Sequence, residues 1–273
     1  MEFPTYNSGI EELEKIESIL DKFCPEKPNL LSRQIGIYKI FKNILSNLKF
    51  LNHINNGECA TQPFATLSRM IIDNYSILYL ISTYSSIKER DLRYYLYLMD
   101  SLEGRINLIE GFSKTVQNNS LIKDFQPSKH VIDHDKRAIK NLMAKIKTDQ
   151  LDEIVSVRVI DKRNWKFDND NHKQKERLSW EDLYIIARIP KRFSKIVQNH
   201  YSTYTHGLGM TILYEPRNES FVESTFLLLS LLNLNIARIL IDEFNLKPDK
   251  MDIDPQFVKF VNHQWENYQK WDN

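Results

Sequence analysis

Cysteine, glycine and proline are all scarce in this sequence. The chain of 273 residues has 2 cysteines, 7 glycines and 9 prolines. The two cysteines, Cys24 and Cys59, are too few for a disulfide framework or a cysteine-rich zinc site. This usage favours a reducing cytoplasm as the location of the protein. Scarce glycine leaves few tight hairpin turns, so long helices are favoured over a sheet.

The chain also lacks an excess of charge of either sign. Its net charge is +1, which argues against a whole-surface basic field for nucleic acid. The N-terminal stretch MEFPTYNSGIEELEKIE has no apolar core, so we do not expect a signal peptide. The apolar stretch 224–241 is interrupted by Asn233, Asn235 and Arg238 and falls short of the roughly 20 residues that span a bilayer. We therefore expect it to be a central, buried helix without membrane contact.

What is present is long segments of apolar residues at helical spacing. They predict an all-α fold, a single-domain bundle over 1–273 of about seven or eight long helices. A small irregular or two-stranded insert is expected near 150–178. Within it, EIVSVRVI is either a short strand, which its β-branched residues favour, or a turn of helix. The helices are expected over 8–20, 29–55, 64–82, 89–112, 128–148, 180–206, 219–244 and 254–270.

Local signals place several ends of these helices. Ser8 with Glu11, and Ser179 with Asp182, have the spacing of a capping box, in which each side chain caps the backbone of the other. Pro190 is expected to kink the sixth helix or divide it in two. The stretches 114–128 and 161–177 are polar or charged, and we expect both to be exposed loops.

Two histidines in NHYSTYTHGLGM are the first candidates for chemistry, because imidazole titrates near neutral pH. If the sixth helix is continuous, His200 lies on its apolar face with Phe193 and Val197. His206 then lies about 120° away, at the helix end before Gly207. The two rings therefore do not meet at one ligand. Each is either a structural residue, in the core or at the helix end, or a general acid or base.

Arg69 and Asp73 are the second candidates. They lie one turn apart on the expected helix 64–82, in very apolar surroundings. Arginine before aspartate is the weaker order for a local ion pair, so a partner on another helix, near Ser202 to His206, explains these charges better. The pair is either structural or an anion-binding arginine held by its aspartate.

Other combinations do not make a convincing site. His130 and His134 have the spacing of two metal ligands on a helix, but they face the polar side beside Arg137. DNDNH at 168–172 begins like a calcium loop but has Lys173 where such a loop needs glycine. There is no phosphate loop, nucleophile elbow or dinucleotide fingerprint. We therefore expect no metal and no cofactor.

Two stretches carry a resemblance. PFATLSRMIIDNYSILYLIS, with its Arg-x-x-x-acid helix, and YSTYTHGLG resemble bacterial all-helical families of unknown function. Some of those families recur near phage-defence genes, and some are grouped distantly with the HEPN ribonucleases. The resemblance implies that Arg69, Asp73, Ser202 and His206 line one pocket. HEPN ribonucleases have four to six residues between their arginine and histidine, whereas Arg192 and His200 here have seven between them.

Two functions follow as hypotheses. The first is a soluble, cytoplasmic helical protein that binds a protein partner or a small anion in a pocket between helices. The binding residues are then Arg69, Asp73 and Ser202. The second is a metal-independent HEPN-type ribonuclease that acts on RNA, in phage defence or as a toxin. A homodimer is the form that this hypothesis favours. In that case the candidate catalytic residues are His206 or His200 as the base, with Arg192 or Arg69 stabilising the phosphorane.

Overall fold

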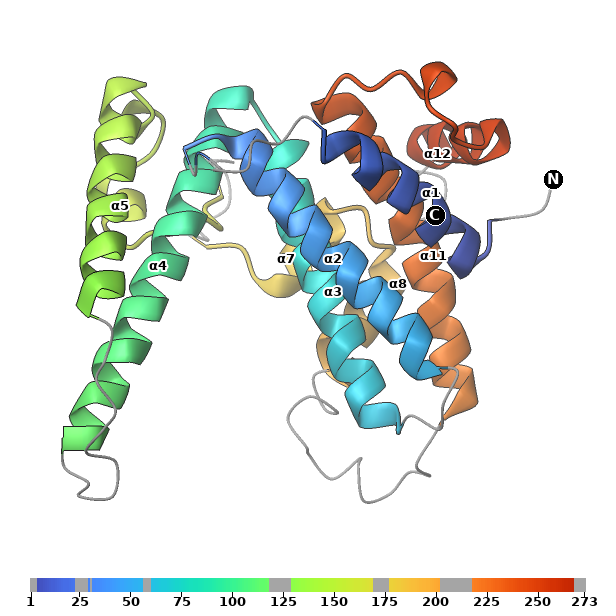
Figure 1. Cartoon of the computed structure of the whole chain (residues 1–273), viewed down its shortest axis with the longest axis horizontal. Coiled ribbons are helices and arrows are strands. Elements are labelled where there is room, and N and C mark those ends of the chain that lie inside the picture. Colours follow the sequence, from blue (N-terminus) through green and yellow to red (C-terminus); the bar gives the residue numbers. More distant parts are fainter. Residues whose placement is uncertain are drawn as a thin grey trace. The chain divides into compact units, whose positions relative to one another are not determined.

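A computed structural model of the chain describes residues 4–22, 29, 31–55, 60–117, 129–168, 177–201 and 218–267 (Figure 1). Every regular element in these ranges is a helix, which confirms the predicted all-α class. The chain forms two compact units: the first comprises Met1–Tyr84 with Ser179–Asn273, and the second is Ser85–Leu178. That the whole chain folds as a single domain stays a prediction.

The first unit is a helical bundle around its most apolar helix, α11. Three helices pack directly on α11, namely α1, α3 and α12; α2 packs on α1 and α3, and α7 packs on α3. The bounds are α1 (Tyr6–Leu20), α2 (Arg33–Asn55), α3 (Thr61–Ser82), α7 (Trp180–Ile186), α8 (Lys191–Ile196), α11 (Glu219–Glu243) and α12 (Pro255–Asn267). The unit also contains a π-helical turn, η3 (Val197–Tyr201), and a 3₁₀ turn, η4 (Pro248–Lys250).

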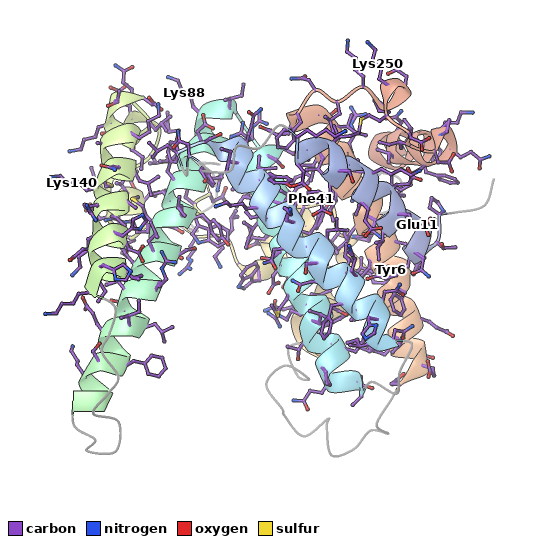
Figure 2. The ribbon with its side chains drawn as sticks, in the orientation of Figure 1. Tyr6, Glu11, Phe41, Lys88, Lys140 and Lys250 are labelled. Carbon is purple, nitrogen blue, oxygen red and sulfur yellow. The ribbon has the colours of Figure 1, made fainter. Side chains whose placement is uncertain are left out.

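The core of this unit is built on close contacts between helices far apart in sequence. Phe41 of α2 is fully buried, and the ring of Tyr6 on α1 lies 4.6 Å from that of Phe226 on α11 (Figure 2). Gly9 lets α1 approach α11, because a Cβ there would lie 2.9 Å from Nδ2 of Asn233. Burial of apolar surface on this scale is the main stabilising term of such a bundle.

The second unit is a long helical pair closed by a short irregular segment. α5 (Lys129–Thr148) packs beside α4 (Ile87–Gln117), with Lys140 on the outer side of α5 (Figures 1 and 2). The segment after α5 contains η2 (Asp152–Ile154) and α6 (Val157–Asp161). Of the two alternatives for EIVSVRVI, the structure shows the turn of helix, in η2 and α6, and the strand is wrong. The described residues of 150–178 contain no strand.

A buried arginine anchors this irregular segment to α4. Arg93 is 0% exposed, and its Nη1 donates to the carbonyl oxygens of Trp165, at 3.1 Å, and Phe167, at 2.7 Å. Its guanidinium also lies 3.8 Å from the centre of the Phe167 ring. The predicted exposed loop over 161–177 is wrong for residues 165–167, because these contacts bury them.

Several predicted ends need correction. Thr5, and not Ser8, is the N-cap of α1, since its Oγ1 accepts a hydrogen bond from the Ser8 backbone N–H at 3.2 Å. α4 continues through residues 114–117, which were expected to be a loop. The capping box of Ser179 and Asp182 is confirmed, with both of its hydrogen bonds formed.

Candidate functional site

Polar side chains of α3 meet the α7 segment in the core of the first unit. The Tyr184 hydroxyl donates to Oδ1 of Asp73 at 2.6 Å, and the Tyr75 hydroxyl donates to the carbonyl of Ala187 at 2.7 Å. One turn further along α3, the Tyr79 hydroxyl accepts from Nε of Arg188 at 3.1 Å. These three contacts fix the position of α7 on α3.

Arg69 lies one turn before Asp73, at the end of this row of contacts. Its side chain is 14% exposed and that of Asp73 is 25% exposed, so the predicted burial of the arginine is confirmed. Its Nε lies 3.6 Å from Oδ2 of Asp73, an ion pair too long to be a hydrogen bond. Nη1 of Arg69 is buried and has no hydrogen-bond partner among the described residues.

Tyr184 explains why the ion pair is loose. Because its hydroxyl binds Oδ1, the carboxylate of Asp73 is held by α7 and is not free to rotate fully toward the arginine. Burial raises the pKa of Tyr184, and the adjacent charge of Asp73 raises it further, while Arg69 offsets part of this effect. Tyr184 is therefore a protonated donor at every physiological pH. A group from another helix does contact this pair, because Tyr184 of α7 binds Asp73. The predicted place of such a group, near Ser202 to His206, lies outside the described residues and stays a prediction.

The predicted sixth helix is interrupted near Pro190. α7 ends at Ile186, Arg188 has a positive φ of 60°, and α8 begins after Pro190. Pro190 thus divides the helix, which is one of the two predicted outcomes. The next turn is a π-helix, so the angular spacing used for the histidines does not apply to it. Ile196, which regular helical spacing would place beside Val197 on the buried face, is 46% exposed.

The remaining predicted site residues have no described side chain. Ser202 and His206 lie outside the described residues. Arg192 lies on α8 and His200 on the π-helical turn, but only their backbones are described. The pocket in which Ser202 and His206 join Arg69 and Asp73 therefore stays a prediction.

Tyr184 and Arg93 are two polar core residues that sequence reasoning missed. Tyr184 sits in the short apolar run LYIIA, where nothing distinguishes it from a packing residue. Arg93 lies between leucine and tyrosines in LRYYLYL, and its lone charge in that run is a usable signal. A buried charge of this kind requires partners, which only the tertiary structure identifies.

The described residues contain no group of three or more side chains suited to hold a metal ion. His134 is instead a surface residue, with 63% of its side chain exposed, beside the buried carboxylate of Asp135. Arg105 binds both oxygens of that carboxylate, at 2.7 and 2.6 Å.

Comparison with known proteins adds no relative: no family model, no curated protein and no solved structure matches the chain. One helix of the described part, α11, is long and apolar enough to cross a membrane. Within its most apolar window, 72% is buried in the structure, as in the core helix of a soluble protein.

Proposed function

We propose that this protein binds a small anion, a carboxylate or a phosphate, at the guanidinium of Arg69. The observation that carries the proposal is the buried Nη1 of Arg69, which has no hydrogen-bond partner among the described residues. A guanidinium has five N–H donors, and a buried donor without an acceptor is costly. A bound anion supplies those acceptors in the planar geometry that arginine prefers.

The neighbouring residues support a role in binding. A purely structural ion pair brings its two charges into hydrogen-bond contact, whereas Asp73 gives its short contact to Tyr184. Asp73 then holds Arg69 by charge at 3.6 Å and forms no hydrogen bond with Nη1. The partial exposure of both side chains leaves a route for a small ligand to reach them.

The experiment measures thermal stabilisation of the full chain by inorganic phosphate and, separately, by acetate. A ligand that binds only the folded state raises the melting temperature as its concentration rises. We expect one of the two anions to raise it, and we expect the double variant Arg69→Met with Asp73→Leu to stay folded and lose the effect.

The chain offers a matched control for this variant. Arg238 and Asp242 on α11 form an ion pair of the same order and spacing, at 2.7 Å, with side chains 30% and 50% exposed. Arg238→Met with Asp242→Leu should keep the anion effect. If neither anion stabilises the wild type, or if both double variants respond alike, the proposal is wrong.

The ribonuclease hypothesis makes a separate prediction. If it holds, the chain cleaves RNA without added metal, and His206→Ala abolishes the cleavage while leaving stabilisation by the anion unchanged. Intact RNA after incubation with the folded wild type contradicts it.

A further inference from the structure

The second half of α4 carries an apolar ridge that the described residues of the second unit leave exposed. Leu108 is 59% exposed and Phe112, one turn later, is 57% exposed. Gly104 and Gly111 lie on the same side, and a Cβ added to either would meet nothing within 4 Å. We call these four residues the α4 ridge. Exposed apolar side chains next to open glycine backbone are typical of a surface that another helix covers.

The ridge is separate from the side of α4 that packs within the unit. Leu102 and Ile106 are buried, at 5% and 7% exposed, on the helix face that meets α5. Asp135 of α5 binds Arg105 beside them. Packing inside the second unit thus accounts for one face of α4 and leaves the ridge without a function in the described fold.

We propose that the α4 ridge binds the α4 ridge of a second copy of this chain, with the two helices antiparallel and a two-fold axis at Leu108. Gly104 and Phe112 lie four residues before and after Leu108, or about 6 Å along the helix in each direction. In this arrangement each Phe112 ring is therefore level with Gly104 of the partner. The Phe112 ring of each copy therefore packs on the backbone of Gly104 in the other copy, and the two Leu108 side chains meet at the axis.

The charges beside the ridge select the antiparallel direction. Lys114 is exposed and forms no ion pair within the described residues. Along the helix axis, Lys114 lies about 9 Å from Leu108. In the antiparallel pair, the partner's Glu103 lies about 7.5 Å and the partner's Asp100 about 12 Å from Leu108 in the same direction, so Lys114 falls between these two acids. The two acids already bind Arg163 and the Trp165 indole, but Glu103 keeps 40% of its side chain exposed. A parallel pair would instead place Lys114 beside its own copy.

The size of the contact sets the expected affinity. The ridge spans about two turns of helix, and a contact of that length buries less than the roughly 800 Å² per partner of a standard stable interface. The pair should therefore be a weak dimer that assembles as the protein concentration rises.

The first experiment follows the mass of the full chain by sedimentation over a wide range of protein concentration. The wild type should shift from monomer to dimer, and Phe112→Glu should weaken the dimer by at least about tenfold. Phe50→Glu is the matched control, because Phe50 on α2 is 54% exposed and lies outside the ridge. A wild type that stays monomeric at every concentration, or equal effects of the two variants, overturns the proposal.

The second experiment tests direction by disulfide formation, in a chain with Cys24→Ser and Cys59→Ser. Leu108→Cys should cross-link to itself, since the axis brings the two copies together. Gly104→Cys and Phe112→Cys should cross-link only when the two variants are mixed. Circular dichroism checks that each variant is folded. Self-cross-linking of Gly104→Cys indicates a parallel pair, and absence of cross-linking by folded Leu108→Cys indicates no pair; either result overturns the proposal.

Discussion

The two units each bury an arginine in apolar surroundings, and the contacts of the two guanidinium groups differ. Arg93 of the second unit is 0% exposed, and it donates to two backbone carbonyls and stacks on Phe167. Arg69 of the first unit is 14% exposed, makes a loose ion pair and has a buried Nη1 without a partner in the described chain. The difference separates an arginine that holds a segment in place by hydrogen bonds from one that is held by a loose ion pair.

Arg93→Met should have the largest effect, because it removes the donor that two buried carbonyls share. Leaving buried acceptors unsatisfied should cost about 3 kcal/mol or more of unfolding free energy, measured by urea denaturation. Hydrogen exchange should rise in α4 and in residues 157–167. Lys140→Met, on the exposed side of α5, is the control and should change little. Equal stability of the two variants would contradict a structural role for Arg93.

Asp73→Ala should come next. It leaves the Arg69 charge and the Tyr184 hydroxyl without their shared acceptor, so it should cost about 2 to 3 kcal/mol. The double variant Arg69→Met with Asp73→Leu should be more stable than Asp73→Ala, because it removes both charges together. Thermal melting of the three chains checks the order. If Asp73→Ala melts like the wild type, the site is exposed and the comparison of the two arginines fails.

Tyr184→Phe tests the contact that keeps the ion pair loose. The loss of one hydrogen bond to a charged group should cost about 1.5 kcal/mol. The same substitution made with Asp73→Asn should cost less, since the two residues interact directly. A double-mutant cycle in urea measures this coupling. Additive effects would show that the short contact contributes nothing, and Tyr184 would then lose its role as the orienting residue.

The smallest effect concerns a third arginine, in an exposed setting. The hydrogen bonds from Arg105 lower the pKa of Asp135, while burial opposes this shift. Because the folded pKa lies below the unfolded one, the pair stabilises the protein above the usual carboxyl range. That stabilisation is lost as the pH falls through the folded pKa.

The corresponding measurement compares Arg105→Gln with the wild type across pH. The variant should be less stable by about 1 kcal/mol at neutral pH, since half of the Arg105 side chain faces solvent. This difference should shrink in acid, below the ordinary pKa of a carboxyl group. The control is Lys136→Gln, which removes an exposed pair with Glu110. A difference that grows in acid would contradict the sign of the shift.

The sequence by itself determined the helical class and most of the helices. Apolar residues at helical spacing set α2, α5 and α11 to within a few residues, because burial of one face stabilises a helix wherever its partner lies. The order of Arg69 and Asp73 along the helix indicated a pair that needs a third group. The capping box at Ser179 also followed from local spacing, since all of its hydrogen bonds lie within one turn.

Only the tertiary structure decided what the charged groups contact. Tyr184 reaches Asp73 across 111 residues of sequence, and Arg93 reaches Phe167 across 74, and no local pattern encodes such distances. The π-helical turn after α8 likewise departs from the regular spacing on which the histidine argument depended. A charged residue in an apolar stretch of sequence indicates that a partner is needed, but the packing of the helices determines which atom is that partner.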